Sequence, residues 1–458
     1  MTKQQKEGNQ SFINDGTTQD KKHQLPYIPV KIIHPAIDYK GDDMILGFND
    51  EVETPKGKTT RPVYIIRESN KYEFRFNPTE VKLTGERYFV ESTTGLPLIN
   101  HRWDPYLALD FVESPSYSKD FYRSINETIY EYIDFRSLNH YRLFTLWIIS
   151  TYFTHLFYAV PYLDLFGPKS SGKTNGLDIV NYLSFNSAKT KITEAAIGDT
   201  ISDQRGVVII DQAERIKPDL VGLLADGYKC GGGRRRIVQG TGTNRKIREF
   251  STYGHKAFGA NKPLPHDLLD RCIQITMVKT TRKVKDINAK EDCWLKHRDQ
   301  LYRFALMCWQ DVRKYYDELS SDGTRIGELW KSLKAVALAL ELPDNEIDSI
   351  ESAFNTCVGG AVNSLTAKEE ALLIALGKKA KDTKKDEFEL KTSDIKELMK
   401  DELDDGNTPS PQWIGQNIAL FGLVEAGGSK PKTRKKHVHY TFKPDRVKDI
   451  VNCYFDIE

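Results

Sequence analysis

A short segment near the middle of the chain has the residue types and spacing of a phosphate-binding loop. Residues 167–174 read Gly-Pro-Lys-Ser-Ser-Gly-Lys-Thr and fit the pattern G-x-x-x-x-G-K-S/T. The glycines allow backbone N–H groups to point at phosphate oxygens. Lys173 would reach the β- and γ-phosphates, and the Thr174 hydroxyl would bind Mg²⁺. The segment therefore predicts binding of ATP and Mg²⁺ by Gly167, Pro168, Lys169, Ser170, Ser171, Gly172, Lys173, Thr174 and Asn175.

A phosphate-binding loop needs a strand before it and a helix after it, and the flanking sequence predicts both. Tyr162–Phe166 is a short apolar run, and residues 175–183 have a helical pattern. The longer stretch Leu143–Leu165 is apolar enough to span a bilayer. However, it contains a histidine, an aspartate and a proline, and it leads straight into a loop that must lie in water. We therefore expect a buried helix followed by a core strand, and no membrane contact.

A second apolar run predicts the metal site. Residues 206–211 read Gly-Val-Val-Ile-Ile-Asp, a buried strand ending in an acid, so Asp211 would hold Mg²⁺ directly or through water. In most P-loop ATPases a glutamate follows and activates the attacking water, whereas here Gln212 follows and the glutamate is Glu214. Gln212 could orient the water without taking its proton, or Glu214 could fold back and act as the base. Glu214 could also be no more than the solvated start of a helix.

Three further residues are candidates for contacts with the γ-phosphate. Asn261 ends another apolar run and would hydrogen-bond the γ-phosphate or the lytic water. Arg271 directly precedes the next run, where ring-forming ATPases place an arginine that enters the neighbouring subunit's site; a salt bridge with Asp270 or Asp267 is the alternative. Arg325 opens a helical stretch and would reach the nucleotide from a lid, unless it is a plain surface arginine.

A basic hairpin pattern lies between the Asp211 strand and the Asn261 strand. The runs Arg235–Gln239 and Arg245–Phe250 flank the turn Gly-Thr-Gly-Thr-Asn. Basic residues on such a hairpin could follow a phosphate backbone, while a solvated surface or a subunit interface would also explain them. The candidate DNA-binding residues are Arg234, Arg235, Arg236, Arg245, Lys246 and Arg248, with Glu249 as the one acid among them.

The last part of the chain predicts a winged helix. Helices are expected at 366–376, 392–403 and 410–420, a short strand at 388–390, and a terminal hairpin from 423–426 and 437–442. The wing between the last two strands is strongly basic and would bind duplex phosphates, although winged helices also mediate protein contacts. Its candidate DNA-binding residues are Lys430, Lys432, Arg434, Lys435 and Lys436.

Pattern changes along the chain predict an α/β protein with five parts. Residues 27–115 read as short strands, and residues 117–160 as helices. We expect a disordered tail at 1–25, a β-rich N-terminal domain at 26–116, an ATPase core with N-terminal helices at 117–290, a helical lid at 291–362 and a winged-helix DNA-binding domain at 363–458.

Composition limits the function only weakly. The formal net charge of +2 neither supports nor excludes nucleic acid as a partner. The six cysteines form no C-x-x-C pair and have no matching histidine spacing, which excludes a recognisable zinc site and suits a reducing compartment. Residues 1–22 are polar and are not a secretory signal. We therefore expect a cytoplasmic protein.

These motifs occur in an order that resembles a known group. The phosphate loop, the D-x-x-E variant at Asp211, the hairpin, Asn261, Arg271 and the winged helix resemble the MCM-like AAA+ replicative helicases of mobile genetic elements, such as staphylococcal cassette chromosomes and pathogenicity islands. The resemblance covers roughly 120–458. It implies an AAA+ core in a homohexameric ring that encircles single-stranded or duplex DNA and translocates by ATP hydrolysis. It also implies an N-terminal collar that contacts DNA or a partner, and element-encoded or host replication proteins as partners.

Two other functions stay open. A DNA-bound ATPase that does not unwind, such as a loader, initiator or regulator, would use its nucleotide state as a switch, and Gln212 favours it because weak hydrolysis suits a switch. A sequence-specific DNA-binding protein could use the ATPase only to control oligomerisation. The basic hairpin favours the motor.

Overall fold

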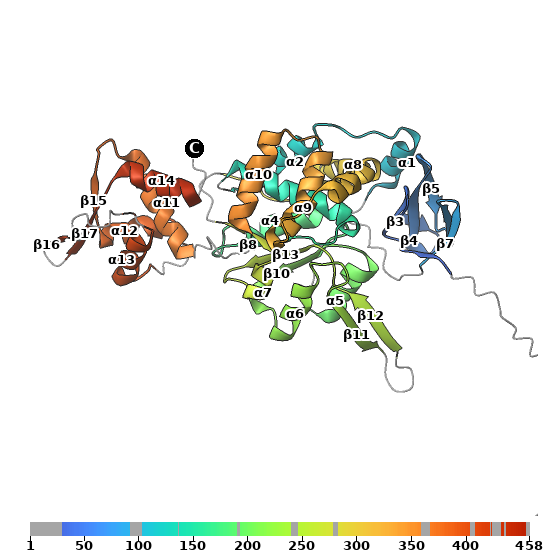
Figure 1. Cartoon of the computed structure of the whole chain (residues 1–458), viewed down its shortest axis with the longest axis horizontal. Helices are drawn as coiled ribbons and strands as arrows, with labels where there is room; N and C mark the ends of the chain where they lie inside the picture. The colour runs from blue at the N-terminus through green and yellow to red at the C-terminus, as the bar shows by residue number, and fades with distance from the viewer. Residues whose placement is uncertain are drawn as a thin grey trace, which may run out of the picture.

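The structure is a computed structural model with a mixed α/β body and a smaller C-terminal module (Figure 1). It describes residues 30–91, 103–135, 137–189, 193–239, 246–277, 283–358, 367–403, 408–421, 423, 432–434 and 437–454. The disordered tail expected at 1–25 lies outside the described residues.

The first part of the chain forms two small sheets. The strands are β1 Ile32–Ile33, β2 Ile37–Lys40, β3 Asp43–Thr54, β4 Gly57–Glu68, β5 Lys71–Phe76, β6 Glu80–Leu83 and β7 Glu86–Val90. Their orders are β2-β3-β4-β5, which is antiparallel, and β1-β7-β6. Side chains alternate across β3 and β4, so that Leu46 and Val63 face the main core of the body while Ile45 and Tyr64 face a small separate cluster. The larger sheet is therefore part of the body's core.

One helix interrupts the region that we expected to contain only strands. Helix α1, Pro105–Glu113, begins after Asp104, whose carboxylate accepts hydrogen bonds from the backbone N–H groups of Tyr106 at 2.8 Å and Leu107 at 3.3 Å. An aspartate cap followed by proline is a strong start signal for a helix. The prediction of strands throughout 27–115 is wrong here.

A five-stranded parallel sheet forms the centre of the body, which confirms the expected α/β class. It consists of β8 Tyr162–Phe166, β9 Ala188–Lys189, β10 Val208–Asp211, β13 Lys256–Ala260 and β14 Cys272–Thr276. The order is β14-β8-β13-β10-β9, and every neighbouring pair is parallel. All residues of β8 and β13 are buried, as expected for central strands covered on both faces.

Helices cover both faces of this sheet. Figure 1 shows α8, α9 and α10 on one side and α6, α7 and the protruding hairpin β11–β12 on the other. The elements are α2 Phe121–Tyr132, α3 Leu138–Ser150, a 3₁₀ turn Thr151–Leu156, α4 Lys173–Leu183, α5 Glu194–Gly198, a π-helical turn Asp199–Asp203, a 3₁₀ turn Ala213–Arg215, α6 Pro218–Asp226, β11 Arg234–Gln239, β12 Lys246–Ser251, α7 His266–Leu269, α8 Asp292–Glu318, α9 Arg325–Ala339 and α10 Asp344–Cys357.

The apolar stretch before the phosphate loop divides into α3, a 3₁₀ turn and β8, so the expected buried helix followed by a core strand is confirmed. None of the helices in the described ranges has the length and apolarity that a bilayer crossing requires.

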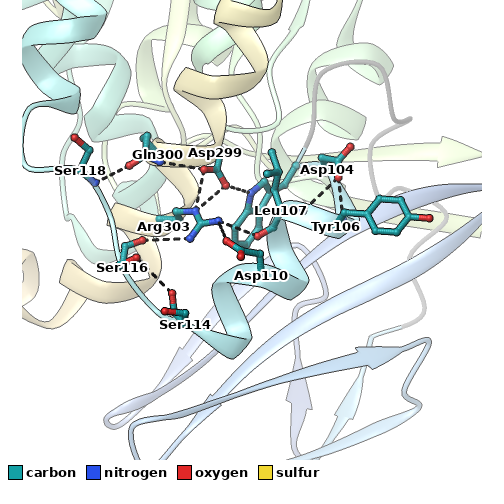
Figure 2. A network of polar contacts seen from close by, with 11 residues as sticks. Asp104, Tyr106, Leu107, Asp110, Ser114, Ser116, Ser118, Asp299, Gln300 and Arg303 are labelled. Carbon is teal, nitrogen blue, oxygen red and sulfur yellow. Dashed lines mark hydrogen bonds and ion pairs between the residues drawn. The ribbon is translucent and has the colours of Figure 1, made fainter.

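A buried arginine joins α1 to α8. Figure 2 shows Arg303 of α8 between Asp299 and Asp110. Its Nε donates to both Asp299 oxygens at 2.8 and 2.9 Å, and its Nη2 donates to Asp110 at 2.7 Å and to the Leu107 carbonyl at 3.1 Å. The Arg303 side chain is 7% exposed and that of Asp299 is 9% exposed, so this pair is buried, whereas the Asp110 side chain is 68% exposed. A charged network therefore joins the helix that follows the N-terminal sheets to the body.

The C-terminal module has its own core. Its elements are α11 Ala367–Asp382, β15 Phe388–Lys391, α12 Thr392–Lys400, α13 Pro411–Leu420, β16 Lys432–Arg434, β17 His437–Phe442 and α14 Pro444–Tyr454, with sheet order β15-β17-β16. The strand expected at 423–426 is described only at Leu423. Strand β16 lies inside the segment that we expected to be the wing, and it pairs with β17. Helix α14, which we did not predict, buries Val447 and Val451 in the module's core.

Candidate nucleotide-binding site and basic hairpin

The phosphate-binding loop takes a curled path that its glycines permit. Gly167 follows β8 with φ of 157°, and a Cβ there would collide with the Met277 carbonyl. Gly172 has φ of 88° at the start of α4, and Ser170 between them has φ of 61°. Left-handed conformations of this kind are inexpensive for glycine but strained for serine, and such strain is common at ligand-binding loops. The strand–loop–helix arrangement is the one that the motif requires.

The Lys173 ammonium lies inside the curl of the loop. Its Nζ donates to the Gly167 carbonyl at 2.8 Å, to the Pro168 carbonyl and to the Ser171 hydroxyl at 3.3 Å, and the residue is 8% exposed. A buried ammonium is stable only when acceptors surround it. Phosphate oxygens could replace these carbonyls, so the side chain is held at the place where the motif needs a cation.

A cavity of about 490 Å³ opens over the loop and brings several distant segments together. The described residues that line it are Tyr132, Ile133, Asp134, Lys169, Ser170, Ser171, Gly172, Lys173, Thr174, Asn175, Asp211, Gln212, Asn261 and Val284. Most of the predicted nucleotide-site residues therefore share one cavity. Residues 132–134 and Val284 come from the end of α2 and the segment before α8, and our sequence reasoning missed them because no local motif marks them.

The order of strands explains this convergence. β13 lies between β8 and β10, with Gly259 opposite both Leu165 and Asp211. Because the strands are parallel, their carboxyl ends meet at one edge, where ligands of α/β sheets bind. The loop after β8, Asn261 after β13 and Asp211 at the end of β10 thus lie side by side.

The oxygen atoms of Asp211 and Thr174 suit a magnesium ion. Asp211 Oδ1 accepts a hydrogen bond from the Gln212 N–H at 2.9 Å, and Oδ2 lies 3.5 Å from Lys189 Nζ, which also pairs with Asp178 at 3.2 Å. The exposed Thr174 lines the same cavity. A carboxylate and a hydroxyl are hard oxygen ligands of the kind that Mg²⁺ takes alongside phosphates and water. The described residues contain no cluster of three or more His, Cys, Asp or Glu that could hold a metal alone, so nucleotide oxygens would have to complete the site.

The two candidates for handling the lytic water lie in different places. Gln212 is exposed, has φ of 58° and lines the cavity. Glu214, in the 3₁₀ turn that follows, is half-buried and accepts hydrogen bonds from Asn261, from its N–H at 3.3 Å and from its Nδ2 at 3.5 Å. Glu214 is therefore folded back toward Asn261 instead of standing in solvent, although it is not among the described residues that line the cavity.

Neither candidate arginine lines the cavity of its own chain. The Arg271 guanidinium lies over the Tyr228 ring, 5.0 Å from its centre, and donates to the Asp267 backbone carbonyl. Arg325 at the start of α9 forms an ion pair of 2.7 Å with Asp270. The carboxylate of Asp270 thus pairs with Arg325, while Arg271 contacts the backbone of Asp267.

The predicted basic hairpin is confirmed as β11 and β12, which pair antiparallel with Arg236 opposite Glu249. Arg236 and Arg234 both pair with Glu249, at 2.8 and 3.5 Å, and Arg235 pairs with Glu194 of α5 at 3.0 Å. The base of the hairpin is anchored by buried Phe250, whose ring packs on Gly198.

The remaining basic candidates are described only in part. Lys246 and Arg248 lie on β12, and Lys432 and Arg434 lie on β16. Arg245, Lys430, Lys435 and Lys436 lie outside the described residues.

Comparisons with known proteins do not assign a family. No family model and no curated protein matches the chain. Among solved structures, the C-terminal region of NrS-1 is 11% identical, with a TM-score of 0.30 over 87% of this chain and 96% of its own. A full-length MCM homolog from Methanopyrus kandleri is 10% identical, with a TM-score of 0.36 over 70% of this chain and 78% of its own. Similarities this weak carry no argument about function.

Proposed function

We propose that this chain is an ATP-dependent DNA translocase with helicase activity that works as a homo-oligomeric AAA+ ring. The observation that supports this most is the shared cavity of the phosphate loop, Asp211 and Asn261, at the carboxyl ends of adjacent parallel strands. A nucleotide triphosphate and its metal need these groups together, and the fold brings them together from three separate segments.

In this proposal each residue has a distinct task during hydrolysis. Lys173 binds the β- and γ-phosphates, and Thr174 and Asp211 hold the metal. Mg²⁺, when bound, neutralises the charge that develops on the phosphates. Glu214 takes the proton of the attacking water, or Gln212 orients that water, while Asn261 holds the γ-phosphate or the water by its amide.

The position of Arg271 supports a ring. Arg271 and Arg325 are remote from the cavity of their own chain, yet phosphoryl transfer needs a cation against the leaving charge. A neighbouring copy could receive both arginines at its own site. We propose a hexamer, as the resemblance to MCM-like helicases implies.

Two basic elements support DNA as the substrate. The hairpin β11–β12 carries arginines and stands out from the body (Figure 1). We propose that the C-terminal module is a winged helix, because helices α11, α12 and α13 precede the β16–β17 segment, and that segment is basic. Lysine and arginine on extended segments bind DNA by neutralising phosphates and releasing counterions.

The test is unwinding of a forked duplex by purified protein, with and without ATP and Mg²⁺. Unwinding should need both, and Lys173→Ala should abolish it together with ATP hydrolysis. Lys217→Ala is the control, because Lys217 is an exposed lysine that does not line the cavity. ATP turnover in Lys173→Ala equal to that of the parent protein would overturn the proposal.

A second function is supported by Gln212, which occupies the position where a glutamate commonly acts as base. Slow hydrolysis that DNA stimulates without any strand separation would favour a DNA-bound switch, such as a loader, initiator or regulator, over the motor.

A further inference from the structure

The side chain of Tyr228 forms the centre of a cationic cluster on the body. Three cations lie over its ring: Arg271 at 5.0 Å, Lys229 at 5.4 Å and Arg325 at 5.8 Å from the ring centre. These residues come from separate elements, the segment after α6, the residue before β14 and the start of α9. The Tyr228 ring is therefore in contact with both candidate trans-acting arginines.

Each cation is also anchored on a second side. Arg325 pairs with Asp270 at 2.7 Å, and Lys229 pairs with Glu328 of α9 at 2.7 Å. Arg271 donates from Nη1 to the Asp267 carbonyl, and its Nε is buried without a hydrogen-bond partner among the described residues. Arg325 and Lys229 are thus each paired with a carboxylate, whereas Arg271 contacts a backbone carbonyl.

Hydrogen bonds hold the backbone that carries the Tyr228 ring. Tyr228 is 9% exposed, and its carbonyl accepts a hydrogen bond from the Val160 N–H at 2.9 Å. The preceding carbonyl, that of Gly227, accepts from the Gly254 N–H at 3.1 Å and from Nζ of the fully buried Lys256 at 3.4 Å. The two ends of the hairpin insertion are thus hydrogen-bonded to each other next to Tyr228, which lies in the turn after α6.

An aromatic face holds a guanidinium in a way that a carboxylate cannot. A carboxylate orients arginine by using its N–H donors, and those donors are then unavailable to a phosphate. A ring attracts the guanidinium through the quadrupole of its face and leaves the N–H groups free at the edge. Of the two arginines, Arg271 is held in this second way, whereas Arg325 is also paired with the Asp270 carboxylate.

We infer that Tyr228 is a positioning residue that holds Arg271 ready for the γ-phosphate of the neighbouring subunit. The inference rests on the proposed ring ATPase.

The test compares Tyr228→Leu with Tyr228→Phe by steady-state ATPase kinetics on the full-length protein. Leucine removes the quadrupole, so kcat should fall about tenfold, equal to about 1.4 kcal/mol, while KM for ATP stays unchanged because Tyr228 does not line the cavity. Phenylalanine keeps the face and should restore kcat. Tyr158→Leu is the matched control: its ring contacts Lys229 at 5.5 Å, and no contact with either arginine is observed among the described residues.

A double variant separates positioning from a structural role. On an Arg271→Ala background, Tyr228→Leu should cause little further loss, because there is no longer an Arg271 to orient. A full additional tenfold loss there, or a Tyr228→Leu enzyme with parental kcat, would overturn the inference while leaving the ATPase proposal intact. A parent protein without ATPase activity would instead overturn the proposed function, and this inference with it.

Discussion

The Glu214 carboxylate faces Asn261 across the edge of the sheet, accepting hydrogen bonds from its backbone N–H at 3.3 Å and its side-chain amide at 3.5 Å. Glu214 follows the end of β10 and Asn261 the end of β13. The candidate base and the candidate γ-phosphate contact therefore form one polar pair beside the cavity.

This pair makes Glu214 the better candidate for the base. Replacing it by glutamine keeps the size but removes the proton acceptor and one of the two hydrogen-bond acceptors, so Glu214→Gln should lower kcat by about 10²- to 10⁴-fold and leave ATP binding unchanged. Single-turnover hydrolysis together with binding of a fluorescent ATP analogue would measure both effects. Gln212→Glu is the companion variant, which should be tolerated. Undiminished turnover in Glu214→Gln would remove this residue from the catalytic set.

Arg271 should act on the neighbouring site. Arg271→Ala alone should lose most of the ATPase activity, because a transition-state arginine of this kind contributes about 10³- to 10⁵-fold. Mixing Arg271→Ala subunits with Lys173→Ala subunits should restore part of it, since some interfaces then combine an intact loop with an intact arginine. If confirmed mixed assemblies remain inactive, Arg271 works within its own chain or has a structural role.

The hairpin should be needed for movement more than for affinity. Replacing Arg245, Lys246 and Arg248 by alanine should reduce DNA-stimulated ATPase and unwinding at saturating DNA more than it reduces equilibrium binding. The reason is that the variant loses only a few contacts to DNA phosphates, while it impairs the hairpin that would follow the DNA strand during translocation. Lys217→Ala, an exposed lysine next to α6, is the control. Full unwinding by the hairpin variant would argue for a solvated surface or a subunit interface.

The basic segment of the C-terminal module should set initial DNA affinity. Replacing Lys432, Arg434, Lys435 and Lys436 by alanine should weaken duplex binding and flatten its salt dependence. The logarithm of affinity falls by roughly 0.9 per neutralised phosphate for each tenfold rise in salt, so losing four contacts should reduce the slope by about 3 to 4. A salt titration of duplex binding measures this. A parental slope would indicate that the module mediates protein contacts.

Asp164, in the middle of β8, should make the protein less stable as the pH rises. Burial raises its pKa from 3.8 to about 7; Gln274 donates to Oδ2 at 2.8 Å, and Oδ1 has no partner among the described residues. The folded state binds the proton more tightly than the unfolded chain, so the contribution is fully present below about pH 4 and is lost as the pH rises through about 7. Asp164→Asn should flatten this decline, by up to about 3–4 kcal/mol between pH 4 and pH 8. Urea unfolding at both pH values tests it, and an unchanged slope would contradict it.

Local sequence patterns were sufficient to predict the parts of the site whose residues lie close together in the sequence. The loop at 167–174 lies between its own strand and helix, so the motif and its context can be read from one short window. The end of β10 at Asp211 and the hairpin strands follow from apolar runs and turn residues in the same way.

Features that depend on tertiary contacts could not be predicted from the sequence. The contributions of Tyr132 and Val284 to the cavity come from packing between segments far apart in sequence. Glu214 reaches Asn261 after Gln212, whose backbone is in the left-handed region. Glutamine rarely adopts this conformation, so the sequence gives no sign of it. Helix α14 carried a local signal, the i,i+4 pair Val447 and Val451, which we did not use.

The N-terminal sheets cannot be exchanged independently of the body. A chimera that replaced residues 30–116 with another N-terminal region would remove Asp110, whose side chain is 68% exposed, and would leave the buried Arg303 paired with Asp299. An ion pair with an exposed partner contributes about 0–1 kcal/mol, so its loss would matter little. The same exchange would also remove Leu46, Phe48 and Val63 from the core of the body, where burying each such side chain contributes about 1.5–3 kcal/mol. Apolar packing, more than the charged network, would therefore decide whether a foreign N-terminal region is accepted.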